Sequence, residues 1–355
     1  MNRITKSMLL ALALFVTAAT SEIHDFCEAG SCELDSAGKG RSLLTLRTAT
    51  RYLPTDTLTI NMLPDRLKTV GISLFGDEAK VIQVLANTKV VPITYSAIVM
   101  RMAMAKDDDA AERFGANGEN GTDYGLDSLL EPTDETEKAF EKRRSEGTRM
   151  LNMIDMGGNL GVTTIAVFKK YPGMVRGVVV EPVPTTHFYL QLNLWLNDVP
   201  PLATGTPVPQ TGVSAIQKAI SSDANFKLEM CIPSIGSSMN AFIVTDQKPC
   251  QTVEKGGRDI ASSVTSMPID SLFDTFGGED VTFVKMDCET CEKDALPAME
   301  KFKSRVRRLG GEMHMMPPDI YKFACAYNQG MYLTGMCERA GTTRYDGKEL
   351  CGHCS

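Results

Sequence analysis

The sequence predicts an α/β fold in which a mostly parallel sheet is flanked by helices. Three short apolar runs, at residues 150–154, 177–180 and 281–286, have the composition of buried strands, and an acidic residue follows each of them. A glycine-rich turn and an apolar helix follow the first run, which is the strand–turn–helix order of α/β domains. Because open parallel sheets bind ligands beyond the carboxyl ends of their strands, we expect these acids to face one crevice.

The composition is that of a globular chain without a nucleic-acid partner. The 355 residues are 43% hydrophobic and carry a formal net charge of −7. This length suffices for one large or two modest domains. No long basic run supplies the clustered Lys and Arg of a duplex-binding surface. The oligomeric state stays open.

The first 20 residues have the pattern of a secretory signal peptide. Arg3 and Lys6 precede an apolar run at residues 8–19, and small and polar residues follow it. A membrane-spanning helix needs about 20 apolar residues, so we expect no stable span beyond this signal. A short signal anchor remains an alternative to a cleaved signal peptide, and an organelle-targeting leader remains an alternative to entry into the secretory pathway.

The rest of the chain divides into three parts by composition. Residues 21–131 are predicted to form an N-terminal extension that ends in an acidic linker, and we assign no chemistry to it. Residues 132–318 are predicted to form the α/β domain, and residues 319–355 a cysteine-rich C-terminal tail. In the extension, residues 70–75 and 90–95 predict strands, whereas residues 77–87 and 96–105 have helical spacing.

All ten cysteines follow the leader, and an even number in a secretory compartment favours disulfides. Cys231 and Cys250 are one candidate pair. The two Cys-x-x-Cys pairs, at 288–291 and 351–354, lie too far apart in the chain for a compact zinc ribbon, so we predict no metal site from them.

The turn after the first strand reads Asp155-x-Gly157-x-Asn159-x-Gly161. Backbone N–H groups at the start of the following helix would point at a ligand, and glycines would let it approach closely. Dinucleotide-binding turns instead have the spacing G-x-G-x-x-G, which disfavours an NAD-linked oxidoreductase. An ordinary glycine-rich turn remains the alternative to a binding site.

Two further acids follow strands at positions that suit a nucleoside. Glu181 lies 20 residues beyond Gly161 and ends the second strand, where an acid accepts hydrogen bonds from ribose hydroxyls. Asp223 follows a third strand, predicted at residues 213–220, and would approach an adenine ring. An Asx turn explains Asp223 equally well.

The segment from Lys285 to Glu292 gathers three carboxylates after a buried strand. Asp287 and Glu289 are the candidates for chemistry, whereas Glu292 fits a helix start for structural reasons equally well. His314 follows a last strand, predicted at residues 307–313, and is a candidate general base.

Five ordered blocks of the sequence resemble the FkbM family of S-adenosyl-L-methionine-dependent methyltransferases. They lie between residues 147 and 318 and read MIDMGGNLG, VVVEP, SLFD, VKMDCETCE and GEMH. The resemblance implies a Rossmann-like class I methyltransferase fold and O-methylation of a sugar, glycan or other hydroxyl-bearing metabolite.

The resemblance also implies roles for the candidate residues. The cofactor would be bound by Asp155, Gly157, Asn159, Gly161, Glu181 and Asp223, whereas Asp287, Glu289 and His314 would orient or deprotonate the acceptor. Nothing in the spacing requires a metal, although these oxygens would suit a divalent cation. Thr290, Cys288 and Cys291 depart from the family pattern, and we expect the two cysteines to be small buried side chains. The alternative function is an inactive methyltransferase fold that serves as a secreted binding module.

Overall fold

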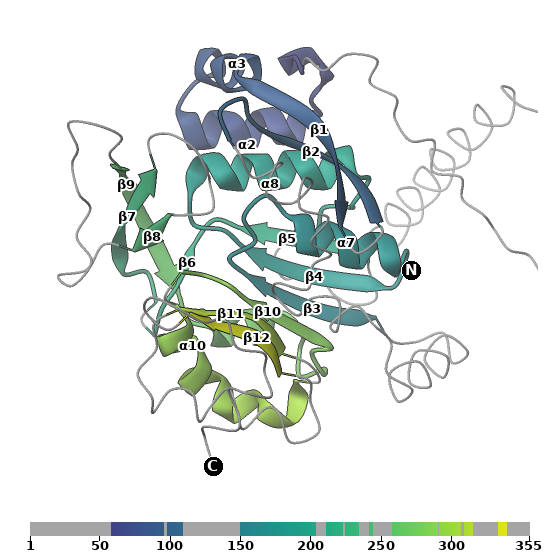
Figure 1. The fold of residues 1–355 in the computed structure, drawn as a ribbon, viewed down its shortest axis with the longest axis vertical. Helices are drawn as coiled ribbons and strands as arrows, with labels where there is room; N and C mark the ends of the chain where they lie inside the picture. Colours follow the sequence, from purple (N-terminus) through teal and green to yellow (C-terminus); the bar gives the residue numbers. More distant parts are fainter. Residues whose placement is uncertain are drawn as a thin grey trace, which may run out of the picture. The chain divides into compact units, whose positions relative to one another are not determined.

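The computed structural model describes residues 58–95, 98–108, 150–203, 211–222, 224–233, 241–243, 258–289, 291–306, 309–314 and 333–338 (Figure 1). All of them belong to the second of the two units into which the chain divides, residues 49–355. The expected leader, the first residues of the predicted α/β domain (132–149), Asp223, Cys250 and Thr290 lie outside the described residues. Among the described helices, none has both the length and the apolar character that crossing a membrane requires.

The central element is a parallel sheet, which confirms the predicted α/β fold. In the described part of the chain it has six strands in the order β12-β11-β10-β3-β4-β5, and all neighbouring strands are parallel. The chain runs outward from β3 to β5 and then returns to β10 on the other side of β3. The strand order therefore reverses between β3 and β10, and ligands bind at such a switch point. The strands are β3 (Leu151–Met156), β4 (Val175–Val180), β5 (Gly212–Ile216), β10 (Phe283–Met286), β11 (Leu309–His314) and β12 (Leu333–Glu338).

Helices cover both faces of this sheet. Alternate side chains of a strand point to opposite faces. Accordingly, Met153 and Val179 join one hydrophobic core with α7 (Val162–Lys170) and α8 (Pro184–Leu196). The residues that alternate with them along the strands, such as Ile154 and Val178, join a second core with α9 (Asp270–Asp274) and α10 (Glu292–Met299). The helix η4 (Glu300–Arg305) directly follows α10. Figure 1 shows α7 and α8 on one side of the strands and α10 on the other.

The N-terminal elements belong to the first of these cores. They are η1 (Ile60–Met62), α2 (Asp65–Phe75), α3 (Glu78–Ala86) and the antiparallel hairpin of β1 (Thr88–Tyr95) and β2 (Ile98–Ala105). Their buried side chains, such as Leu67 and Val81, pack in the same cluster as Phe188 of α8. The described part of the predicted extension is therefore packed against the helices of the sheet domain.

Two expectations for this region are wrong. Residues 70–75 were expected as a strand but belong to α2, and residues 96–105 were expected as a helix but contain β2. The N-cap of α2 is Pro64, and its C-cap is Gly76, whose φ of 95° ends the helix in the left-handed conformation. The predicted helix at residues 77–87 and strand at residues 90–95 are confirmed by α3 and β1.

A second sheet lies between β5 and α9 in the sequence. Its order is β6-β9-β7-β8, with β6 (Ala219–Ile220), β9 (Arg258–Met267), β7 (Lys227–Pro233) and β8 (Phe242–Ile243). The single strand predicted at residues 213–220 is wrong, because it divides into β5 of the parallel sheet and β6 of this one. A small core of Val183, Met230, Ala241 and Val264 joins the second sheet to the segment that follows β4.

Candidate functional site

The predicted strand, glycine turn and helix are confirmed by β3, a loop at residues 157–161 and α7. The N–H groups of Gly157 and Gly158 both donate to the carbonyl of Val180 in β4, at 3.0 and 2.9 Å. Gly157, Asn159 and Gly161 have φ values of 80°, 45° and 88°. Glycine adopts this left-handed conformation without penalty, and asparagine tolerates it better than most residues do. The alternation of Gly, Asn and Gly therefore suits the path of the loop, which we call the glycine loop.

The glycines are required by contacts inside the protein. A Cβ atom at Gly157 would lie 1.8 Å from the carbonyl oxygen of Asp287, and one at Gly158 would lie 2.2 Å from Val179 Cγ2. A Cβ atom at Gly161 would lie 2.7 Å from Leu190 Cδ1. The described contacts thus explain the glycines by close packing, whereas the sequence suggested the approach of a ligand. Ligand contacts of Gly157, Asn159 and Gly161 stay a prediction.

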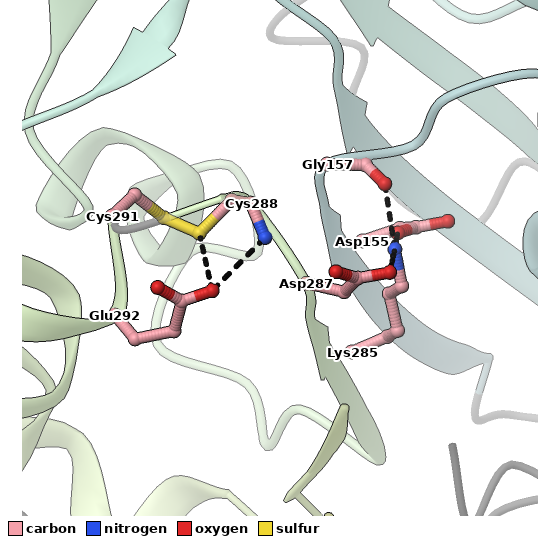
Figure 2. Close-up of a disulfide and its surroundings, with 7 residues drawn as sticks. All are labelled: Asp155, Gly157, Lys285, Asp287, Cys288, Cys291 and Glu292. Carbon is pink, nitrogen blue, oxygen red and sulfur yellow. Dashed lines mark hydrogen bonds and ion pairs between the residues drawn. A yellow bond between two sulfur atoms is a disulfide. The ribbon is translucent and has the colours of Figure 1, made fainter. Parts of the chain in front are cut away.

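Lys285 connects the glycine loop to the acidic segment that follows β10. Its ammonium group donates to the carbonyl of Gly157 at 2.6 Å and lies 3.3 Å from Asp155 Oδ1 and 3.6 Å from Asp287 Oδ2 (Figure 2). The side chain is 6% exposed. Burial alone would lower the pKa of Lys285, but the carboxylates of Asp155 and Asp287 outweigh it and raise that pKa above its ordinary value. One buried cation therefore holds both strand ends together.

Sequence reasoning missed Lys285 as a site residue, although a signal for it exists. It is the one charged residue within β10, whose four residues are all buried. The register places it directly beside Asp155 of β3. A lysine in a buried strand requires a paired acid, and Asp155 is such an acid on the predicted neighbouring strand.

Asp155 is a buried internal residue. Its Oδ2 accepts a hydrogen bond from Thr164 Oγ1 of α7 at 2.5 Å, and its Oδ1 faces Lys285. The side chain is almost fully buried. Asp155 thus ties β3 to both α7 and β10, and its predicted effect on a cofactor would act through the glycine loop.

Glu181 is a second support of the glycine loop. Its carboxylate accepts the N–H of Asn159 on one oxygen and the N–H of Val183 on the other, both at 2.9 Å. Burial raises the pKa of Glu181 to about 7, although the two N–H donors and Lys285 oppose the increase. Because each carboxylate oxygen has two lone pairs, one remains on each for a further donor.

The acidic segment places its carboxylates differently. The N–H of Asp287 donates to the carbonyl of Met156 at 3.0 Å, and its side chain is 23% exposed. Glu289 is half-buried and has a φ of 55°. Glu292 is fully buried at the start of α10 and accepts the N–H of Cys288 at 3.1 Å, so it caps the preceding turn. Asp287 and Glu289 keep the partial exposure that contact with a substrate requires.

The expectation that Cys288 and Cys291 are separate small side chains is wrong, because they form a disulfide (Figure 2). Their Cα atoms are 5.4 Å apart, within the range that a disulfide spans. The bond encloses the segment that carries Glu289. Cys231 is also disulfide-bonded, whereas its predicted partner Cys250 lies outside the described residues.

The remaining candidates are placed only by the backbone or not at all. His314 ends β11, next to β10, and pairs in register with Glu338 of β12. Its backbone lies at the carboxyl edge of the sheet, three residues beyond Gly311, the register partner of Met286. Asp223 lies outside the described residues. Within the described ranges, no group of three or more His, Cys, Asp or Glu side chains is placed to hold a metal ion.

A comparison with protein families matches this part of the chain. The model of the methyltransferase FkbM domain matches residues 155–328, from the start of the glycine turn to beyond β11. Comparisons with curated proteins and with solved structures found no match. The matched range contains the glycine loop, Glu181, the acidic segment and His314.

Proposed function

Residues 155–328 place the chain in the FkbM methyltransferase family, and from this premise we propose a specific reaction. The chain transfers the methyl group of S-adenosyl-L-methionine to a hydroxyl oxygen of a glycan or another hydroxyl-bearing metabolite. The observation that carries this proposal is the contact of Lys285 with Gly157, Asp155 and Asp287. It unites the expected cofactor loop and the expected acceptor residues at the switch point of the sheet.

The charges at the strand ends suit this cofactor. S-adenosyl-L-methionine carries a sulfonium and an ammonium group, and carboxylates stabilise such cations. Lys285 is buried between Asp155 and Asp287, whereas Glu289 retains exposure. Glu181 would bind the ribose, because its two remaining lone pairs match two neighbouring hydroxyls. The donor set present is therefore compatible with the cofactor.

The reaction requires orientation of an acceptor and removal of its proton. The bound cofactor supplies an electrophilic methyl group. Asp287 would accept a hydrogen bond from the acceptor hydroxyl and take its proton, and Lys285 fixes the carboxylate for this purpose. Glu289 and His314 are the further candidates for contact with the acceptor.

Labelled methyl transfer from S-adenosyl-L-methionine to a panel of glycans and hydroxylated metabolites tests the proposal. We expect Asp287→Asn to lower kcat on the best acceptor by about 100-fold or more, which is the usual contribution of a general base. The affinity for S-adenosylhomocysteine should stay within about threefold of the wild-type value, since Asn keeps the shape of the side chain. The matched control is Asp270→Asn, a change in an exposed acid of α9.

Two outcomes would contradict this division of roles. One is transfer by the Asp287→Asn variant at the wild-type rate. The other is a loss of cofactor affinity as large as the loss of kcat. The alternative function, an inactive binding module, is not favoured by the family match, and transfer to no acceptor at all would revive it.

Entry into the secretory pathway is a separate proposal, which the charged and apolar pattern of residues 1–20 supports. The cofactor is made in the cytosol, so a lumenal enzyme would need imported S-adenosyl-L-methionine. Sequencing the N-terminus of the mature protein tests whether residues 1–20 are removed as a signal peptide, and a mature chain that begins at Met1 would contradict that removal.

A further inference from the structure

We propose that Asn193 of α8 is a positioning residue that anchors the glycine loop to the N-terminal hairpin. This inference rests on the proposed function, in which the glycine loop binds the cofactor. It gives the segment at residues 58–108, to which the sequence assigned no chemistry, a part in cofactor binding.

Asn193 is fully buried, and its carboxamide is satisfied by two segments from distant parts of the chain. Its Oδ1 accepts the N–H of Ala103 at 2.5 Å, and its Nδ2 donates to the carbonyl of Ala103 at 3.1 Å. The same Nδ2 donates to the carbonyl of Leu160 at 2.9 Å. Leu160 belongs to the glycine loop, and Ala103 belongs to β2. One side chain thus links the loop to the hairpin.

A second asparagine shows how α8 binds the hairpin. Asn197 accepts the N–H of Arg101 at 3.1 Å and donates to its carbonyl at 2.7 Å. Four residues of a helix rise about 6 Å, and two residues of a strand rise about 7 Å. Asn193 and Asn197 therefore match alternate residues of β2, whose N–H and C=O groups point to the same edge. The helix takes the place of a neighbouring strand along this edge.

The two asparagines differ in their third hydrogen bond. Nδ2 of Asn197 donates to the carbonyl of Asn193 within α8 at 2.9 Å, whereas Nδ2 of Asn193 reaches Leu160. Outside its own helix, Asn197 therefore binds only the hairpin, whereas Asn193 binds both the hairpin and the glycine loop. This difference makes Asn197 a matched control.

The glycine loop needs an anchor at Leu160. The neighbouring residues Asn159 and Gly161 both have left-handed backbones, and Glu181 holds the N–H of Asn159. Asn193 of α8 holds the carbonyl of the next residue, Leu160. Without it, a buried carbonyl would lose its partner, which costs free energy and favours other loop conformations.

The test compares Asn193→Ala with Asn197→Ala in the full-length chain. Each change removes three hydrogen bonds, so we expect both variants to unfold at lower temperature than the wild type. We expect the Kd for S-adenosylhomocysteine to rise at least about tenfold in Asn193→Ala and to change less than about twofold in Asn197→Ala. Should Asn193→Ala fail to fold, Asn193→Ser retains a hydroxyl donor and is measured in the same way.

Amide hydrogen exchange of residues 157–161 provides a readout that needs no ligand. We expect faster exchange in Asn193→Ala alone. Equal exchange and equal affinity in the two variants would overturn the role of Asn193. A wild-type chain that binds no S-adenosylhomocysteine, with faster loop exchange in Asn193→Ala, would overturn the proposed function and leave the anchor in place.

Discussion

At Lys285, one buried ammonium group lies between carboxylates from two positions along neighbouring strands. Asp155 of β3 is the register partner of Lys285, and Asp287 lies two residues after Lys285, just beyond the end of β10. A buried charge without a partner is far less favourable than a buried pair. The three residues therefore depend on one another, and removal of the cation leaves a carboxylate of β3 buried without its ion pair.

We expect Lys285→Met to lower the free energy of unfolding by about 3 to 5 kcal/mol. The matched control is Lys301→Met, because Lys301 forms an exposed ion pair with Asp270, and exposed pairs contribute about 1 kcal/mol or less. Urea unfolding of both variants measures the difference. If Lys285→Met loses no more stability than Lys301→Met, Lys285 is not the connection between the strand ends.

Glu181 gives the site a dependence on pH. Its pKa of about 7 means that the carboxylate is mostly protonated at pH 6 and mostly ionised at pH 8. The ionised form is the better acceptor for ribose hydroxyls, so affinity should rise with pH. If only the ionised form binds, the Kd for S-adenosylhomocysteine falls by about tenfold from pH 6 to pH 8.

Calorimetry at several pH values measures this dependence. The control variant is Glu181→Gln, which does not titrate, and we expect it to bind weakly with little change over the same range. A wild-type affinity that is independent of pH between 6 and 8 would argue against contact between Glu181 and the ligand.

The candidate residues differ in how far the sequence revealed them. Glu181 could be located because its distance from the glycines reflects the fixed length of a strand–helix–strand unit. Lys285 was missed because its importance depends on strand order, which places β10 beside β3 although about 130 residues separate them in the chain. The disulfide of Cys288 and Cys291 was missed because the pairing depends on a turn that the sequence leaves open.

Among the elements, the glycine loop illustrates how a correct prediction can have a different physical cause. Gly157 approaches the backbone of Asp287, so the end of β3 and the end of β10 are in direct contact. A glycine there is needed before any ligand binds.

We expect Gly157→Ala to be much more destabilising than Gly173→Ala. Both glycines have a positive φ, 80° and 74°, so both variants lose about 1 to 2 kcal/mol from backbone conformation. A Cβ atom at Gly173 meets nothing within 4 Å, whereas one at Gly157 would overlap a backbone oxygen. The overlap should cost about 1 to 3 kcal/mol more, or prevent folding. Equal losses in thermal unfolding would contradict the close contact of the two strand ends.

The helices and strands of the N-terminal segment were the hardest to predict. Residues 98–105 are rich in Met and Ala, which favour helices, yet they form β2. Tertiary contacts decide the outcome, because β1 pairs with one edge of β2 and the asparagines of α8 bind the other. Such contacts readily override the helix propensity of individual residues.

For the molecule as a whole, the described structure assigns the segment at residues 58–108 to the core of the sheet domain. It packs with α7 and α8, and the carboxamide of Asn193 connects it to the glycine loop. The matched family domain, residues 155–328, does not include this segment. The segment therefore lies outside the matched range and is linked to the glycine loop through Asn193.

Calorimetry of the full-length, oxidised protein with S-adenosylhomocysteine, beside NAD, tests the central proposal most directly. We expect S-adenosylhomocysteine to bind at one site, and Glu181→Ala to weaken it strongly, because Glu181 lies next to the glycine loop. We expect no binding of NAD, since the glycine spacing differs from that of dinucleotide-binding turns. Binding of NAD in preference to S-adenosylhomocysteine, or binding of neither ligand, would contradict the proposal.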